Sequence, residues 1–381
     1  MNIALLGLGT VGRAVYDIII IKKQVAIFKK EEINISHILV RNKAKYFNIP
    51  SYLLTTNYDD IINDSSVDVV IEMMGASVSF EYMKKALLAK KHVITANKEV
   101  IAMLYECLQK IAIENGVKLL FEASVGGSIP IVHTLINSAP FNDITSIKGI
   151  LNGTTNFILT SMQNEHLTFD DALKLAQEKG FAEADPTADL EGLDMVRKIA
   201  ILSMICYGCP IDINKIYHYG ISKVTREIVE ISNLLGYNLK FVASSYKIDD
   251  KISICVEPVL LKQNQLLATV EYEYNLVEYC GKSSGIQTMY GKGAGPNTCN
   301  SILFDLGLLV NEYKQDFMPS NSYEIVGNKG IKAKYFIQPK GKIDSYFVNK
   351  NFKKFIISKD LSSEELQHLM PSILFYARII D

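Results

Sequence analysis

Between residues 183 and 198 the sequence concentrates side chains that could do chemistry, directly ahead of an apolar run at 199–206. Asp194 and Lys198 are four residues apart, which places them on one face of a helix with the acid on the N-terminal side, the favourable order. Charges on a buried helix are costly unless they are paired or used. The segment is therefore a structural ion pair or a polar substrate site, and the number of acids favours the substrate site. Those acids are Glu183, Asp185, Asp189, Glu191 and Asp194.

A glycine-rich turn near the start of the chain has the spacing of a phosphate-binding loop. An apolar run at 2–6 predicts a buried strand, and the pattern from residue 11 onward predicts a helix, so G-x-G-x-x-G lies in the strand–turn–helix context that this motif requires. Gly7 suits the tight turn, Gly9 lets the backbone approach a pyrophosphate, and Gly12 lets helix and strand pack closely. The helix N-terminus adds amides and positive potential for the phosphates.

The end of the next expected strand, at 36–40, bears on the choice of cofactor. An NAD site usually has an acid there for the ribose 2′-hydroxyl, whereas an arginine accommodates a 2′-phosphate. Arg41 and Lys43 follow this strand, so we expect NADP, with NAD as the alternative. The other interpretation of the two residues is a pair of solvated loop cations.

Strands and helices continue to alternate as far as residue 121, which predicts a parallel, doubly wound sheet. Further strands are expected at 67–73, 92–95 and 117–121, with helices at 80–88 and 98–114. Ligands bind at the carboxyl ends of such strands. Gly75 and Lys98 are therefore candidate cofactor contacts, although a lysine at a helix start is often only a surface residue.

Glu122 follows the fifth strand and precedes a pair of glycines at 126–127. Exposed backbone carbonyls beside a carboxylate are oxygen ligands of the kind that suits a hard cation. From the spacing alone, a plain strand-to-helix turn leading to Pro130 is the stronger explanation.

Residues 144–300 predict a second domain of mixed strands and helices. Its expected strands lie at 144–151, 239–246, 252–256, 276–280 and 286–290, and its expected helices at 170–179, 199–206 and 225–234. A glycine-rich loop at 291–297, which includes Gly293, precedes a helix at 298–311 and could return the chain to the cofactor.

The composition excludes several classes of protein. Forty Lys and Arg residues balance 41 Asp and Glu residues, so no global charge attracts nucleic acid or an acidic membrane. The first residues lack the features of a signal peptide, and the apolar runs are too short to span a bilayer. Six scattered cysteines are not a disulfide framework, and the C-x-x-C at Cys206 and Cys209 indicates a structural pair. We expect a cytoplasmic protein that binds neither nucleic acid nor membrane.

Five motifs in order resemble those of the homoserine dehydrogenase family, over about residues 1–312. They are G-L-G-T-V-G at 7–12, T-A-N-K at 95–98, E-A-S-V-G-G-S-I-P-I at 122–131, L-N-G-T-T-N-F-I-L at 151–159 and A-E-A-D-P-T-A-D-L-E-G-L-D-M-V-R-K at 182–198. The resemblance implies an N-terminal Rossmann-type doubly wound parallel sheet followed by an α+β catalytic and dimerisation domain. It also implies reversible NAD(P)-dependent interconversion of L-aspartate 4-semialdehyde and L-homoserine, in the threonine and methionine branch of amino-acid biosynthesis, by a homodimer or higher homo-oligomer.

The same resemblance implies roles for individual residues. Lys98 and Lys198 bracket the reacting carbonyl, while Glu183 and Asp194 bind substrate and support the lysine. The remaining implied contacts are a sodium site and backbone contacts to the cofactor phosphates: Glu122 with the carbonyls of Val125, Gly127 and Ile129 for sodium, and Thr10 and Val11 for the phosphates.

Reduction of an aldehyde requires a hydride, which a nicotinamide supplies, and a proton. The developing alkoxide needs a cation or an acid nearby. Desolvation lowers the pKa of a lysine on an apolar helix and a neighbouring carboxylate raises it, so such a lysine can exchange a proton near neutral pH. We therefore expect Lys198 to donate the proton and Asp194 to orient it. Glu183 suits the α-ammonium of the substrate, and Lys98 or loop amides suit its α-carboxylate.

These expectations divide the chain into a dinucleotide-binding domain at 1–131, joined by the helix at 298–312, a substrate-binding and dimerisation domain at 132–297, and a short α/β tail at 330–381. Many family members carry a C-terminal ACT regulatory domain, and this tail is too short for a full ββαβ-type effector module with its linker. We expect a truncated ACT-like remnant that packs on the core or on a second subunit, without feedback inhibition by threonine. Its expected strands lie at 334–338, 355–358 and 373–379, and its helix at 362–370.

Two other classes of function remain as alternatives. A phosphorylating semialdehyde dehydrogenase needs a cysteine nucleophile activated by a histidine, and none of the six cysteines follows a strand at a suitable turn. A catalytically silent Rossmann subunit is disfavoured because Lys98, Glu183, Asp194 and Lys198 are all present.

Overall fold

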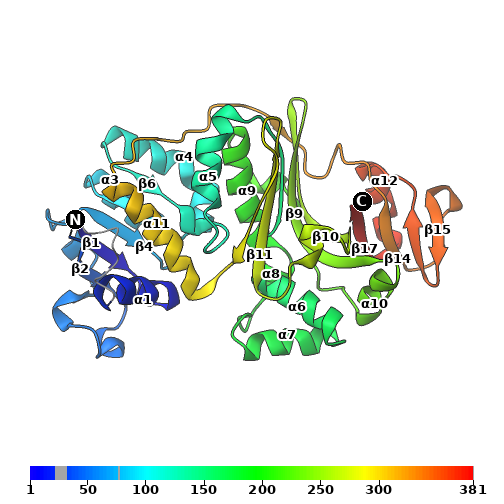
Figure 1. Cartoon of the computed structure of the whole chain (residues 1–381), viewed down its shortest axis with the longest axis horizontal. Helices are drawn as coiled ribbons and strands as arrows, with labels where there is room; N and C mark the ends of the chain where they lie inside the picture. Colours follow the sequence, from blue (N-terminus) through cyan, green and yellow to red (C-terminus); the bar gives the residue numbers. More distant parts are fainter. Residues whose placement is uncertain (22–31, 76–77, 381) are drawn as a thin grey trace. The chain divides into compact units, whose positions relative to one another are not determined.

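The computed structural model describes residues 1–21, 32–75 and 78–380, which form two compact units. The first unit comprises Met1–Ser138 and Gly293–Ser320, and the second comprises Ala139–Lys292 and Asn321–Asp381. Each unit is built around one sheet, labelled in Figure 1.

The sheet of the first unit has six parallel strands in the order β3-β2-β1-β4-β5-β6. This is the strand order of the doubly wound dinucleotide-binding fold, which confirms the expected fold class. The strands are β1 (Asn2–Leu6), β2 (Asn34–Leu39), β3 (Leu54–Thr55), β4 (Val69–Glu72), β5 (His92–Thr95) and β6 (Leu119–Leu120). The helices of this unit are α1 (Thr10–Tyr16), α2 (Asp59–Ile62), α3 (Ser79–Leu88), α4 (Lys98–Glu114), α5 (Ile131–Ser138) and α11 (Cys299–Val310).

Helix α11 is part of the first unit although 160 residues separate it from α5 in the sequence. It contacts α1. Ile302 and Leu306 are fully buried in the same apolar cluster as Ile3 and Leu5 of β1. Burial of this kind is the main favourable contribution to packing of the helix. The helix therefore completes the core beneath the glycine-rich turn.

The second unit contains an 11-stranded sheet whose main path runs β12-β11-β7-β9-β10-β17-β14-β16-β15. Helix α9 (Leu193–Tyr207) contacts β7, β9 and β10, and almost all of its residues are buried, as its apolar sequence predicts. The strands are β7 (Ile144–Ile150), β9 (Tyr237–Ile248), β10 (Lys251–Lys262), β11 (Tyr274–Gly281), β12 (Gly285–Lys292), β14 (Tyr335–Pro339), β15 (Val348–Phe352), β16 (Phe355–Ser358) and β17 (Ile373–Ile380), with β8 (Tyr217–His218) and β13 (Glu324–Ile325) also paired to β10. The other helices are α6 (Gly153–Asn164), α7 (Phe169–Glu178), α8 (Thr187–Leu190), α10 (Arg226–Leu234) and α12 (Ser363–Leu369).

The tail continues the sheet of the second unit, as its orange and red strands show in Figure 1. Strand β17 pairs parallel with β10 and antiparallel with β14, so the tail is joined to the main sheet by backbone hydrogen bonds. The expected three strands are present, but β15 was missed. The tail contains β15, β16, α12 and β17 in ββαβ order, although we expected it to be too short for a full ββαβ-type module with its linker.

A buried ion pair lies where the tail meets the main sheet. Arg378 Nε on β17 is 2.8 Å from Glu257 Oε1 on β10, and the two side chains are 5% and 1% exposed. Arg378 also donates to Ser244 Oγ on β9 at 3.0 Å. The tail strand β17 is thus connected to the consecutive strands β9 and β10 by charged and polar side chains in the interior of the unit.

Candidate functional site

The acid–lysine pair expected on the buried helix is present in the second unit. Lys198 Nζ lies 2.8 Å from Asp194 Oδ2, and the two side chains are 10% and 5% exposed. The ammonium also donates to the backbone oxygen of Leu151 at 2.6 Å. Because Leu151 follows β7, the lysine is held between its own helix and the adjacent strand end.

Asn152 completes this buried group, and sequence analysis noted it only as a residue in a polar turn. Its Nδ2 donates to Asp194 Oδ2 at 2.8 Å and to Asp189 Oδ1 at 2.7 Å. Asn152 is 37 residues from Asp189 and 42 residues from Asp194, so no local sequence pattern could predict either contact. Two of the five clustered acids are thus connected through one amide.

The other three acids lie outside this group. Glu183 is exposed in the loop before α8, and its backbone oxygen accepts a hydrogen bond from Gln177. Asp185 accepts from the backbone and hydroxyl of Thr187, which shapes the start of α8. Glu191, which had no expected role, accepts from Ser222 Oγ at 2.7 Å. Glu183 is therefore exposed to solvent, whereas Asp185 and Glu191 accept hydrogen bonds from neighbouring residues.

In the first unit, the glycine-rich turn has the geometry of a phosphate-binding loop. Gly7 has a φ of +95°, which favours glycine, and a Cβ on Gly12 would lie 2.3 Å from the oxygen of Gly7. A Cβ on Gly9 would meet nothing within 4 Å, so this position is open to a ligand. Thr10 is exposed and Val11 is half-buried at the first positions of α1.

The other expected cofactor residues occupy loops of the same unit. Arg41 and Lys43 are exposed beyond β2. Gly75 has a φ of +61° after β4, and Gly293 is buried just before the turn Gly295–Thr298, which contacts α1.

Lys98 is half-buried as the first residue of α4, beyond the carboxyl end of β5. A buried acid that sequence analysis missed, Glu72 at the end of β4, organises the neighbouring loops. It accepts hydrogen bonds from Thr95 Oγ1 at 2.6 Å, from Ser79 Oγ at 2.8 Å and from the backbone of Met74 at 2.8 Å. Glu72 thus connects the strand ends that carry Gly75 and Lys98.

Glu122 is fully buried in the turn after β6, and its carboxylate contacts the first turn of α5. Its two carboxylate oxygens accept from the backbone amides of Val132 and His133, each at 2.8 Å. Burial, together with the nearby carboxylate of Asp305, raises the pKa of Glu122 to about 7. Asp305 is itself fully buried, and its Oδ1 lies 2.9 Å from Nε2 of His133.

The carbonyls expected beside Glu122 are partly engaged. The Gly127 oxygen accepts from Ser301 Oγ at 2.6 Å, and the Ile129 oxygen accepts from the backbone of Ile131 at 2.8 Å. A carbonyl oxygen has two lone pairs, so each retains capacity for a cation. Within residues 1–21, 32–75 and 78–380, no group of three or more His, Cys, Asp or Glu side chains could hold a metal ion. The buried carboxylate of Asp305 lies beside both the backbone amide of Glu122 and the imidazole of His133.

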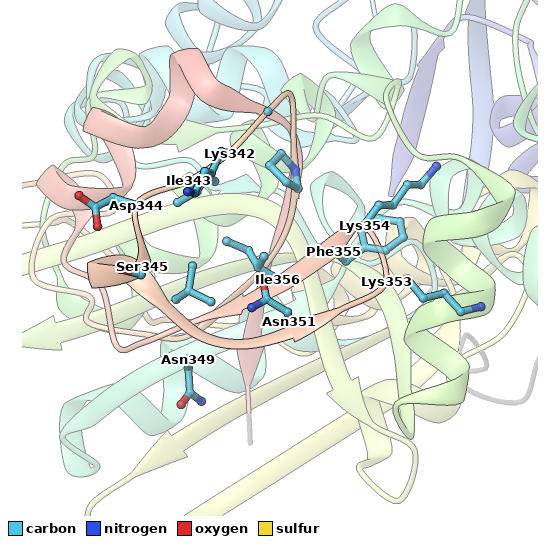
Figure 2. Close-up of a pocket in the computed structure, with 13 residues that line it drawn as sticks. Lys342, Ile343, Asp344, Ser345, Asn349, Asn351, Lys353, Lys354, Phe355 and Ile356 are labelled. Carbon is cyan, nitrogen blue, oxygen red and sulfur yellow. The ribbon is translucent and has the colours of Figure 1, made fainter.

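A cavity of about 930 Å³ lies in the tail, and none of the expected site residues lines it. Figure 2 shows the side chains of Lys353 and Lys354 extending away from Ile356 and Asn351. Lys354 is ion-paired with Glu227 of α10. The lining groups therefore do not converge on a ligand.

The cysteines offer little chemistry. Cys206 and Cys209 are both buried, and burial raises the pKa of the Cys206 thiol far above its usual range. This agrees with a structural pair.

Among the helices that the structure describes, none is long and apolar enough to cross a membrane.

Two family models match most of the chain. The model described as homoserine dehydrogenase matches residues 130–306, and the model described as homoserine dehydrogenase, NAD binding domain, matches residues 7–122. A homoserine dehydrogenase of Bacillus subtilis (strain 168) is 38% identical over 351 residues, which are 91% of this chain and 79% of the relative.

Solved structures extend the similarity to the whole chain. A crystal structure of a homoserine dehydrogenase from Thiobacillus denitrificans has a TM-score of 0.92 and 29% identity, and the match covers 100% of this chain and 98% of that chain. A hyperthermophilic archaeal homoserine dehydrogenase in complex with NADPH has a TM-score of 0.72 and 26% identity, and the match covers 83% of this chain and 99% of that one.

Proposed function

Because the chain belongs to the homoserine dehydrogenase family, an oxidoreductase acting on a CH–OH group with NAD(P), we propose that it reversibly reduces L-aspartate 4-semialdehyde to L-homoserine. The buried Asp194–Lys198 pair is the observation that supports this chemistry. It supplies a cation and a proton in a water-poor environment, where an alkoxide develops.

In the proposed mechanism, Lys198 donates the proton to the aldehyde oxygen. Bound NAD(P)H supplies the hydride. Asp194 keeps the ammonium in place during the transfer. The exposed Glu183 binds the substrate α-ammonium, and Lys98 binds the α-carboxylate.

One assay tests the function directly. Oxidation of NADPH is followed with L-aspartate 4-semialdehyde in a buffer without phosphate, and the product is identified chromatographically. We expect turnover and homoserine. Phosphate-dependent reduction of NADP⁺ by the semialdehyde supports the phosphorylating alternative, because that reaction oxidises the aldehyde. No turnover with either form of the cofactor supports a silent subunit.

We further propose NADPH as the preferred cofactor, because Arg41 and Lys43 are exposed beyond β2 where a 2′-phosphate would lie. The archaeal relative with bound NADPH is consistent with this choice. The test compares kcat/KM for NADPH and NADH in the wild type and in Arg41→Ala. The variant should lose efficiency with NADPH only, whereas a wild-type preference for NADH contradicts the proposal.

A sodium ion held by Glu122 and the carbonyls of Val125, Gly127 and Ile129 is proposed because Glu122 and Asp305 are both fully buried acids. The ion would offset negative charge and fix the turn before α5. Thermal unfolding in sodium and in choline chloride at equal ionic strength tests it without an activity assay. Sodium should raise the melting temperature of the wild type and not that of Glu122→Gln.

A homodimer is proposed because β12 is an edge strand that is exposed along most of its length. Ile286 and Tyr290 on this strand are 64% and 56% exposed. An exposed edge with apolar side chains is a template for pairing with a second chain. Light scattering on the wild type and on Ile286→Lys tests it, with a dimer expected for the first and dissociation for the second.

A further inference from the structure

Asn152 connects the start of α6 to the acids of the buried group. The residue is 4% exposed. Its Oδ1 accepts from the backbone amide of Thr155 at 2.8 Å and from its hydroxyl at 3.0 Å. Its Nδ2 donates to Asp189 and Asp194. The orientation of the amide is therefore determined, because only an oxygen can face the Thr155 amide and only an NH₂ group can face two carboxylates.

Asn152, Asp194, Lys198 and Leu151 form a closed loop of contacts. Asp194 Oδ2 accepts from Asn152 at 2.8 Å and from Lys198 Nζ at the same distance. Lys198 also donates to Leu151, the residue that precedes Asn152 in the chain. Rotation of the Asp194 carboxylate would thus break contacts to both the amide and the ammonium.

We propose that Asn152 is a positioning residue for the reaction. It fixes Asp194 Oδ2 and thereby the direction in which Lys198 presents its proton. This inference rests on the proposed function, since it requires Lys198 to be the proton donor.

Helix capping alone does not explain an asparagine at this position. Aspartate and serine cap helices about as well as asparagine, and threonine also caps them. In the same unit, Thr168, Thr225 and Ser362 cap α7, α10 and α12 through their hydroxyl groups. At residue 152 an aspartate would retain the cap but place a third carboxylate against Asp189 and Asp194. The need for an amide therefore comes from the two acids.

Two variants that retain a capping oxygen separate positioning from capping. In Asn152→Asp the added negative charge favours the ammonium form of Lys198. The pH above which kcat for reduction falls, because Lys198 has lost its proton, should therefore rise by about one unit. Its kcat should fall on the order of 100-fold, as for a misplaced catalytic group. In Asn152→Ser, which adds no charge, kcat should fall by about tenfold with KM for the semialdehyde and the pH profile close to those of the wild type.

The matched control is Thr225→Ala, which removes the cap of α10, a helix that carries none of the residues of the buried group. It should lower the melting temperature and leave kcat and the pH profile unchanged. Wild-type kcat in Asn152→Ser, or a wild-type pH profile and kcat in Asn152→Asp, overturns the inference. If Asn152→Asp does not fold, the kcat of Asn152→Ser alone tests the inference. Failure of the proposed function is a separate result, namely a wild type without turnover or a Lys198→Ala variant with normal kcat.

Discussion

Asp194 and Lys198 form an ion pair of 2.8 Å across one turn of α9, with both side chains at most one-tenth exposed. Lys198→Met should lower kcat for semialdehyde reduction by 10²- to 10⁴-fold, roughly the contribution of a positioned proton donor. Titration of NADPH fluorescence should show cofactor binding close to that of the wild type.

Replacing Lys198 also leaves Asp194 as a buried acid without its cation, which is costly to stability. The double variant Lys198→Met with Asp194→Asn controls for this effect. It should be more stable than Lys198→Met and equally inactive. A Lys198→Met enzyme with near-normal kcat would show that the pair is only structural.

Gly9 and Gly12 should respond differently to the same substitution. Gly12→Ala places a Cβ 2.3 Å from the oxygen of Gly7, so the variant should be destabilised by about 1–3 kcal/mol, as in overpacked cores. The Cβ added in Gly9→Ala meets no atom within 4 Å, so this variant should have the same free energy of unfolding as the wild type. It should bind NADPH more weakly, because the Cβ occupies the space open to the ligand. Urea unfolding and cofactor titration of both variants check this. Equal stability of the two would contradict the geometry.

Lys240 on β9 gives a pH-dependent prediction. It is 2% exposed and donates to the backbone oxygen of Val270, and burial lowers its pKa from 10.5 to about 8. Below pH 8 the folded protein bears the full cost of a buried ammonium, roughly 3 kcal/mol from 1.4 kcal/mol per pH unit. Between pH 8 and 10.5 the unfolded chain binds more protons than the folded one, so this contribution to stability rises with pH.

Lys240→Met removes that cost and leaves Val270 with its contact to Asn156. The variant should be more stable than the wild type at pH 7, and the difference should shrink as the pH approaches 10.5. Urea unfolding at several pH values measures it. Lys174→Met, at an exposed position on α7, is the matched control for the loss of one lysine. A constant difference across this pH range argues against a buried ammonium.

The Arg378–Glu257 pair should be sensitive to the loss of one partner. Arg378→Met leaves Glu257 buried near Tyr376 without its cation, and we expect a loss of about 3–5 kcal/mol in the free energy of unfolding. Arg378→Met combined with Glu257→Gln removes both charges and should recover much of this loss. Circular dichroism during urea unfolding measures both. A single variant within 1 kcal/mol of the wild type would contradict the role of the pair in holding the tail.

Local pattern was enough to predict most of the elements in this chain. The G-x-G-x-x-G turn, the alternation that follows it and the apolar sequence of α9 each depend on residues close in sequence, so their structures could be foreseen. Asp194 and Lys198 could be paired for the same reason, since they lie one turn apart. Strand β15 was missed because Val348–Phe352 is mostly polar and exposed, as suits an edge strand.

The remaining features depend on contacts that no local pattern records. Glu72 lies at the end of an apolar run, so its position in the sequence does not indicate that it accepts hydrogen bonds from Ser79 and Thr95. Asn152 meets its acids only because β7 and α9 are adjacent in the second unit. The joining of β17 to β10 requires a register between strands more than a hundred residues apart.

Placing α11 in the core of the first unit has a consequence for synthesis and for fragmentation. The segment 1–138 lacks Ile302, Leu306 and Asp305, so it would expose an apolar face and leave His133 without its acid. The ribosome synthesises strands β7 to β12 of the second unit before it makes this helix. The core of the first unit is therefore completed late in synthesis, through contacts between residues far apart in sequence, which are slow to form. A fragment cut at residue 138 should aggregate unless the segment 293–320 is supplied.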